Sequence, residues 1–122
     1  MQHVSIPMPP DGHATARTFF STALGLEEKP APVSLGSGVI WFQAGSNGQE
    51  LHVYEDERWS GAPTGQHLCM EVDDLVEFRR RLETHGMAIE EAVPIRNRPR
   101  CFVRDPFGNL IEITQILGDY AS

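Results

Sequence analysis

Polar and apolar residues alternate at the start of the chain and then change to a helical spacing. Residues 2–6 place Val4 and Ile6 on one side and His3 on the other, which is typical of a half-buried strand. After a segment rich in proline, residues 13–24 carry apolar side chains at intervals of three and four and stop at a glycine. This pattern predicts a strand followed by an amphipathic helix.

The rest of the first half reads as strands joined by turns. A proline-containing connection has room for one short strand, and residues 39–42 and 50–54 are rich in apolar and β-branched residues on either side of a Gly-Ser-Asn-Gly turn. Two such runs separated by turn residues predict a hairpin. The first half is therefore expected to fold as strand, helix and three strands.

The same order of elements returns after a segment of acidic, glycine, proline and serine residues. The second half begins with an alternating strand over 66–72 and continues with a helix over 75–85, which Asp73 or Asp74 can cap. A short strand over 87–95 and a hairpin over 100–114 complete it.

This repeat predicts an internal duplication. We expect an α+β fold in which two βαβββ modules form a curled mixed sheet around a shared cavity. The predicted single domain consists of module one at 1–55, a linker at 56–65 and module two at 66–117.

Length and charge narrow the possible functions. The 122 residues support one domain, and the net charge of −7 argues against a surface that binds nucleic acid. No apolar run is long enough to cross a membrane and no signal peptide is recognisable, so we expect a cytoplasmic protein. Cys69 and Cys101 are expected to be reduced core residues.

Chemistry-bearing side chains gather on the polar faces of the predicted strands. His3 and His67 occupy the same place in the two modules, and Glu112 stands between two isoleucines that face the other way. Two imidazoles and a carboxylate suit a divalent first-row metal. The alternative is a solvated sheet face, which also carries polar residues, but the recurrence of histidine favours the metal.

The fourth ligand stays open between Glu50 and His52, because both lie on one face of the predicted strand 50–54. Counting from the hairpin turns matches His52 with Glu112. His52 can instead support another ligand or carry a proton for bound substrate.

The segments Gln2-His3-Val4, Gly65-Gln66-His67-Leu68 and residues 104–113 (Arg-Asp-Pro-Phe-Gly-Asn-Leu-Ile-Glu-Ile) resemble the vicinal oxygen chelate superfamily. This superfamily includes glyoxalase I, extradiol dioxygenases, fosfomycin-resistance transferases and bleomycin-resistance proteins. The resemblance covers nearly the whole chain and implies metal ligands at His3, His67 and Glu112. The glyoxalase-like pattern adds a carboxylate at Glu50.

The resemblance implies a small metal-dependent enzyme that holds adjacent oxygens of a small-molecule substrate on a divalent ion (Zn, Ni, Fe or Mn) and stabilises an anionic intermediate. A lyase or isomerase is slightly favoured over an extradiol-type dioxygenase. Glu112 or Glu50 would move the proton in the first case, and His52 and Tyr54 are candidates to assist oxygen chemistry in the second.

The other class of function is a metal-free binding protein of the bleomycin-resistance kind. It would hold a flat ligand against Trp41, Phe42 and Phe102. The arginine cluster around Arg100 could hold an anion or could simply be solvated, and in either class of function Trp41, Phe102, Arg100 and Tyr54 are the candidate substrate-binding residues.

A homodimer is expected, since an open sheet edge in so short a chain is most simply covered by a second copy. The resemblance implies that such dimers can build each site from two chains. His3, with Glu50 or His52, would then meet His67 and Glu112 of the partner.

Overall fold

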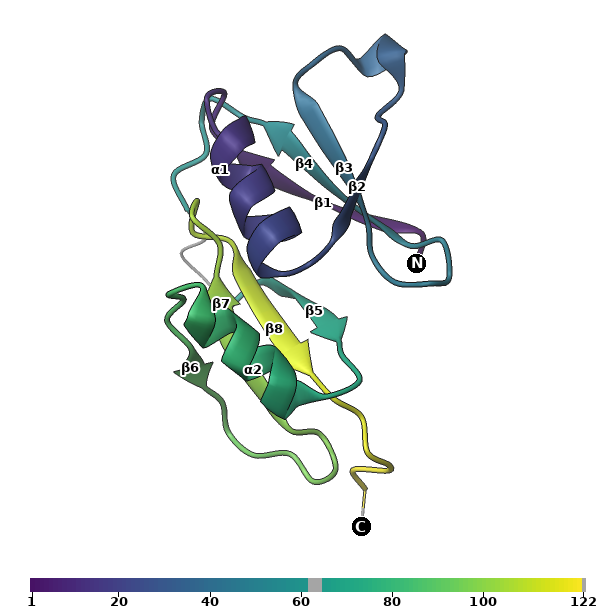
Figure 1. The fold of residues 1–122 in the computed structure, drawn as a ribbon, viewed down its shortest axis with the longest axis vertical. Helices are drawn as coiled ribbons and strands as arrows, with labels where there is room; N and C mark the ends of the chain where they lie inside the picture. Colours follow the sequence, from purple (N-terminus) through teal and green to yellow (C-terminus); the bar gives the residue numbers. More distant parts are fainter. Residues whose placement is uncertain (62–64, 122) are drawn as a thin grey trace. The chain divides into compact units, whose positions relative to one another are not determined.

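The computed structural model describes residues 1–61 and 65–121, which form two compact units. Unit 1 comprises residues 1–61 and 106–109, and unit 2 comprises the described residues of 65–105 and 110–121. Both units show the predicted order of elements (Figure 1). The α+β class and the two βαβββ modules are thereby confirmed, whereas the shared cavity and the module boundaries stay predictions. Residues 62–64 of the predicted linker lie outside the described residues.

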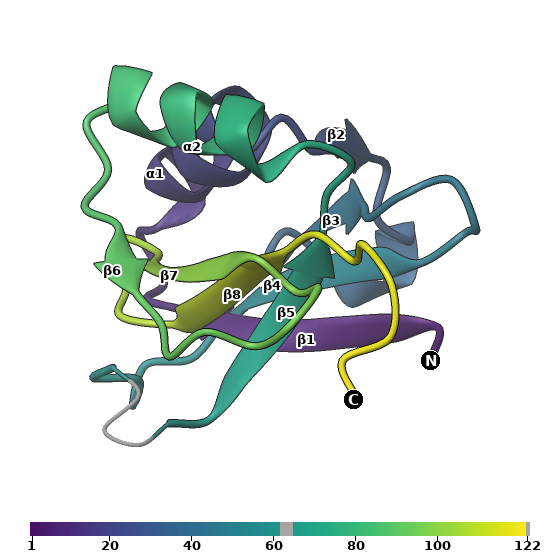
Figure 2. The same cartoon turned by 90° about the horizontal axis from the view of Figure 1, so that it is seen from below.

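Unit 1 is a four-stranded sheet with one helical segment on its face. Its strands stand in the order β1-β4-β3-β2, in which β1 is parallel to β4 and the other pairs are antiparallel. The helical segment lies over one face of this sheet (Figure 2). The elements are β1 (His3–Met8), α1 (His13–Arg17), η1 (Thr18–Ala23), β2 (Glu27–Lys29), η2 (Val33–Leu35), β3 (Val39–Gln43) and β4 (Glu50–Glu55).

The predicted helix over 13–24 is not α-helical throughout. It is an α-helix to Arg17 and then a π-helix, in which the N–H of Leu24 bonds to the carbonyl oxygen of Phe19 five residues back. The predicted apolar face is nevertheless the buried one. Phe20 packs on Phe42 with ring centroids 5.6 Å apart, and both are fully buried.

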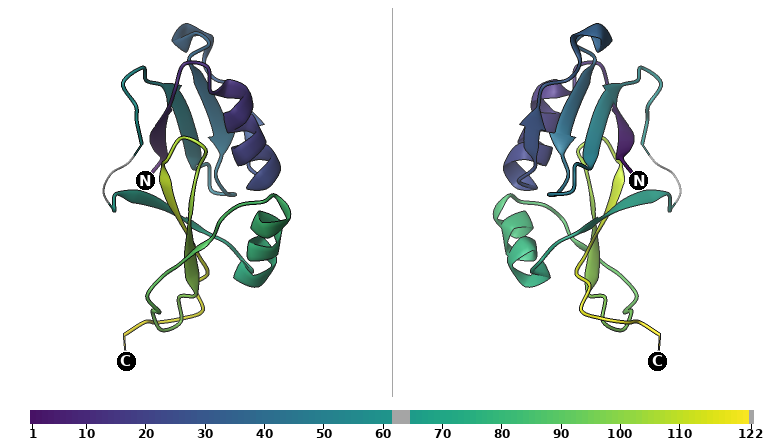
Figure 3. Two further views of the ribbon diagram at one scale, coloured as in Figure 1. Left: turned by 90° about the vertical axis from the view of Figure 1, so that its left-hand side faces the viewer. Right: turned by 90° about the vertical axis from the view of Figure 1, so that its right-hand side faces the viewer.

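Unit 2 repeats this architecture with the strand order β5-β8-β7-β6, in which β5 is parallel to β8. Its helix lies against one face of the sheet (Figure 3), where Leu75 and Leu82 are buried together with the inward residues of β7 and β8. The elements are β5 (His67–Glu71), α2 (Leu75–Thr84), β6 (Glu90–Glu91), β7 (Arg100–Arg104) and β8 (Leu110–Thr114).

Three local features refine the sequence predictions for unit 2. Asp74 caps α2, because its side chain accepts a hydrogen bond from the N–H of Glu77 at 3.2 Å. The strand expected over 87–95 pairs only at Glu90–Glu91, since the segment beyond it contains a proline and leaves the ladder. Cys101 is buried as predicted, but the core prediction is wrong for Cys69, which lies on the exposed polar face of β5.

The turn between β7 and β8 packs within unit 1. Asn109 donates to the carbonyl oxygen of Pro7 at 2.9 Å, and the indole N–H of Trp59 donates to the carbonyl oxygen of Phe107 at 2.9 Å. The Asp-Pro-Phe-Gly-Asn turn and the described part of the predicted linker are therefore held by specific hydrogen bonds. No helix among the described residues is long and apolar enough to cross a membrane.

Candidate metal centre

The strand registers show which residues of the two units are equivalent. In unit 1, β1 places His3 opposite Glu50, and Ser5 lies opposite His52. In unit 2, β5 places His67 opposite Leu110, and Cys69 lies opposite Glu112. His52 therefore occupies the position in unit 1 that Glu112 occupies in unit 2, and the counterpart of Glu50 is the apolar Leu110.

Three aromatic rings form a stack on the polar face of unit 1. The ring of His52 lies between the other two, with centroids 3.9 Å from Trp41 and 4.2 Å from His3 and interplanar angles of 7° and 19°. Only 8% of His52 is exposed. The stack fixes the plane of the His52 imidazole before any ligand is bound.

Glu50 lies beside this stack and is held at both carboxylate oxygens. One oxygen lies 2.9 Å from Nε2 of His52, and the other lies 2.6 Å from Nζ of Lys29. The hydrogen bond from Lys29, followed by that from His52, lowers the pKa of Glu50 to about 2. Glu50 is therefore ionised at neutral pH and is a weak proton acceptor.

The polar face of unit 2 brings together His67 and Glu112. Nε2 of His67 lies 3.0 Å from Oε1 of Glu112, and Nη1 of Arg100 lies 3.5 Å from Oε2. Phe102 meets the His67 ring edge-on with centroids 5.1 Å apart. Partial burial and the Glu112 carboxylate raise the pKa of the Cys69 thiol to about 11, which makes that thiol a poor nucleophile.

The hydrogen bonds of the histidines determine which ring nitrogens are free to bind a metal. Nδ1 of His67 lies 2.7 Å from the carbonyl oxygen of Gly65, which only accepts, so Nδ1 carries the proton. Nε2 then faces the Glu112 carboxylate, which also only accepts. These two groups are therefore suited to hold a metal ion between them.

His3 and His52, the candidate ligands of unit 1, follow the same rule. The side-chain NH₂ of Gln2 donates to the carbonyl oxygen of Gly48. This hydrogen bond orients the Gln2 amide so that its Oε1 faces Nδ1 of His3 at 2.6 Å. His52 donates through Nε2 to Glu50. Each histidine thus has one nitrogen bound to a fixed acceptor and one lone pair available, an arrangement that suits metal ligation.

The candidate ligands therefore form two half-sites, one in each unit. His3 and His52 belong to unit 1, whereas His67 and Glu112 belong to unit 2. Within residues 1–61 and 65–121, no group of three or more His, Cys, Asp or Glu side chains is placed to hold a metal ion. The residues fit a metal by donor type and orientation, and each half-site supplies part of the set.

Several partners of the predicted ligands could not be predicted from the sequence. Lys29 belongs to β2 and contacts Glu50. The contacts of Gln2 and Gly65 depend on the orientation of an amide group and a backbone carbonyl, which no side-chain pattern reveals.

The candidate substrate-binding residues have different surroundings. Trp41 is half-buried in the ring stack, Phe102 and Arg100 lie beside Glu112, and Tyr54 is 38% exposed at the far end of β4. Phe42, expected as a ligand-binding wall in a metal-free binder, is fully buried in the core. Phe42 is therefore a core residue, and its side chain packs against Phe20 of the helical segment.

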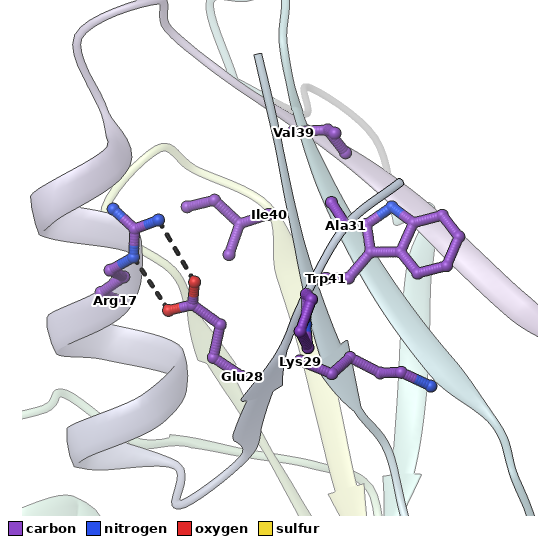
Figure 4. Close-up of a pocket in the computed structure, with 8 residues that line it drawn as sticks. Arg17, Glu28, Lys29, Ala31, Val39, Ile40 and Trp41 are labelled. Atoms are coloured by element: carbon purple, nitrogen blue, oxygen red, sulfur yellow. Dashed lines mark hydrogen bonds and ion pairs between the residues drawn. The ribbon is translucent and has the colours of Figure 1, made fainter. Parts of the chain in front are cut away.

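A pocket of about 360 Å³ lies at the β2–β3 end of unit 1 (Figure 4). On one side, Arg17 and Glu28 form a two-bonded ion pair with N to O distances of 2.8 and 3.2 Å. On the other side lie Lys29 and Trp41. Pro30, Ala31, Val39 and Ile40 complete the lining.

Comparison with known proteins places the chain in a family. The family model described as the Glyoxalase/Bleomycin resistance protein/Dioxygenase superfamily matches residues 1–113. The chain belongs to this superfamily. No match was found among curated proteins.

Solved structures of the same fold span different activities. A putative glyoxalase family protein from Bacillus anthracis is 29% identical with a TM-score of 0.87, covering 95% of this chain and 93% of that one. The lactoylglutathione lyase from Agrobacterium tumefaciens is 22% identical with a TM-score of 0.71, covering 94% and 92%. The fosfomycin resistance protein FosX from Listeria monocytogenes is 14% identical with a TM-score of 0.73, covering 94% and 91%. The last two share the fold alone.

Proposed function

We propose that the chain is a small metal-dependent enzyme of lyase or isomerase type that acts on a substrate with two adjacent oxygen atoms. The observation that supports this proposal is the orientation of its three histidines on the strands. In each of them one ring nitrogen donates to a fixed acceptor, which leaves the other as a ligand.

The proposed ligand set is His3, His52, His67 and Glu112. His52 is preferred to Glu50 because the strand registers make it the counterpart of Glu112. Both oxygens of Glu50 are already engaged by Lys29 and His52. Glu50 is therefore proposed to orient the His52 ring through the hydrogen bond that it accepts from Nε2.

Three imidazoles and one carboxylate suit Zn, Ni, Fe or Mn. When bound, such an ion supplies Lewis acidity that stabilises negative charge on adjacent substrate oxygens. The set is proposed to be completed in a homodimer, with the half-site of unit 1 from one chain and that of unit 2 from the partner.

Glu112 is the proposed proton carrier for a lyase or isomerase reaction. Its Oε1 faces His67, and its Oε2 lies at ion-pair distance from Arg100. Glu50 is less suited to this task, because the pKa of about 2 that Lys29 gives it makes proton uptake unfavourable at neutral pH.

Matched substitutions test the roles of His52 and Glu50. Isothermal titration with Zn²⁺ should show that His52→Ala loses most of the affinity, because a ligand is removed. Glu50→Gln should weaken binding by about 10–100-fold, as expected for a residue that orients a ligand. Glu57→Gln, at an exposed position in the described linker, serves as the control. If Glu50→Gln abolished binding and His52→Ala preserved it, the two roles would be reversed.

The reaction type is tested by incubating the metal-loaded protein in D₂O with adducts of 2-oxoaldehydes and thiols, and separately with catechols. Deuterium incorporation next to the substrate carbonyl would support proton transfer of the lyase or isomerase kind. Oxygen consumption with a catechol would instead identify an extradiol-type dioxygenase, which also uses two histidines and a carboxylate.

A metal-free binding protein is the second candidate. The pocket lined by Trp41 and Lys29 favours this candidate, since an aromatic wall beside a cation suits a flat anionic ligand. Retention of ligand binding in chelator-treated protein, together with a lack of metal uptake, would establish it.

A further inference from the structure

Two arginines at the start of β7 have no role in the proposed ligand set, and one of them, Arg100, lies beside Glu112. Arg100 is the first residue of β7, and Arg98 ends the turn just before it, where its N–H bonds to the carbonyl oxygen of Ile95. Phe102, two residues after Arg100, is the register partner of Glu112. Arg100 therefore lies on the same face of β7 as Phe102, and Arg98 directly precedes this strand.

Both guanidinium groups have hydrogen-bond donors that the described residues do not satisfy. The Nε atoms of Arg98 and Arg100 are buried and have no acceptor among those residues. Arg100 donates through Nη2 to the carbonyl oxygen of Val93 at 2.8 Å, and its Nη1 lies 3.5 Å from Glu112. A buried N–H without an acceptor is unfavourable, and a charged one more so.

The face of each guanidinium group lies over an aromatic ring. Cζ of Arg98 lies 4.6 Å from the centroid of the Tyr120 ring, and Cζ of Arg100 lies 5.6 Å from that of Phe102. Contacts of this kind leave the edges of a guanidinium, where its N–H groups point, available to an oxyanion.

We propose that Arg98 and Arg100 form a binding site for an oxyanion, a carboxylate or phosphate group of a small molecule, next to His67 and Glu112. A small movement of each guanidinium toward such a group would give its Nε an acceptor. The site selects substrates that carry an anionic group besides the oxygens that react. Its assignment to the substrate rests on the proposed function, whereas the anion site itself does not.

The test observes the arginine Nε–H signals directly by ¹H–¹⁵N NMR of chelator-treated protein at constant ionic strength. Inorganic phosphate is titrated in one arm and acetate in the other. Saturable shifts of the Arg98 and Arg100 signals are expected, and the anion that saturates at the lower concentration identifies the class of the group. Linear shifts without saturation in both arms would overturn the proposal.

Variants separate this site from general charge effects. Arg100→Gln and Arg98→Gln should each lower the affinity for the anion that binds more tightly to the wild type by about tenfold or more. Each substitution removes a charged hydrogen-bonding partner. Arg80→Gln, an exposed change on α2, should leave the affinity unchanged. Equal affinity in all three variants would overturn the proposal, and the use of two independent site variants guards against misfolding of one. The titration uses metal-free protein, so a negative result would not contradict the proposed metal site. Likewise, a failure to bind metal would not contradict the anion site.

Discussion

Replacing Glu112 by alanine is expected to abolish stoichiometric metal binding while leaving the fold intact. Glu112 supplies the only carboxylate in the proposed ligand set, and its side chain lies on the polar face of β8, between Ile111 and Ile113, which are fully buried on the other face. Loss of a direct ligand should cost more than the 10–100-fold typical of an orienting residue. The metal content of the purified variant, measured by mass spectrometry, should be close to zero.

The matched control for this variant is Glu71→Ala. Glu71 is an exposed carboxylate at the end of β5, on the same sheet of unit 2. It should retain the metal content of the wild type. Circular dichroism and thermal unfolding of both variants show whether a loss of metal reflects the site or the fold. Equal metal content in Glu112→Ala and the wild type would contradict the assignment of Glu112.

Mixing two variants that cannot bind metal is expected to restore sites if each site is shared between chains. With His3→Ala in one chain and Glu112→Ala in the other, a mixed dimer has one site with neither change and one site with both. Random exchange of subunits should therefore restore roughly one quarter of all sites. Sites built within one chain would restore none, because every chain carries a defect.

The control for this mixture combines His67→Ala with Glu112→Ala. These residues belong to the same unit, so every half-site of unit 2 is damaged and no exchange can restore a complete site. Recovery of metal binding in the first mixture and not in the control mixture supports a site that is shared between chains. Absence of recovery from exchanged dimers would rule out the shared site, and sedimentation of the wild type as a monomer would rule out the dimer.

The hydrophobic pattern was sufficient to predict the architecture because burial imposes it. The alternation around Glu112 required Ile111 and Ile113 to face the core, and both are fully buried. The same reasoning placed His3 and His67 on polar faces. It could not predict that residues 18–23 form a π-helix, since the same side chains would be buried in either helical form.

The details of the candidate site depend on contacts that a pattern does not encode. Glu50 and His52 share one strand face, and only the pairing with β1 shows that His52 is the counterpart of Glu112. Lys29 belongs to a strand of three residues, all of them charged, so no polar–apolar alternation marks it. The tautomer of His67 follows from one backbone carbonyl, that of Gly65.

Family membership establishes the fold of this chain and leaves its chemistry to the site. Structures with the same fold include one titled a lactoylglutathione lyase and one titled a fosfomycin resistance protein. The residues that would distinguish such activities are those around the half-sites, including Arg98, Arg100 and Trp41. The substrate is therefore best sought among small molecules that combine adjacent oxygens with an anionic group.

The metal content of freshly purified wild-type protein tests the central claim most directly. The protein should be expressed without an affinity tag that binds metal and measured by inductively coupled plasma mass spectrometry. The proposed set of three histidines and Glu112 predicts about one divalent first-row ion per chain. Protein that contains no such ion, and takes up none from Zn²⁺, Ni²⁺, Fe²⁺ or Mn²⁺ added in equimolar amounts, would contradict it.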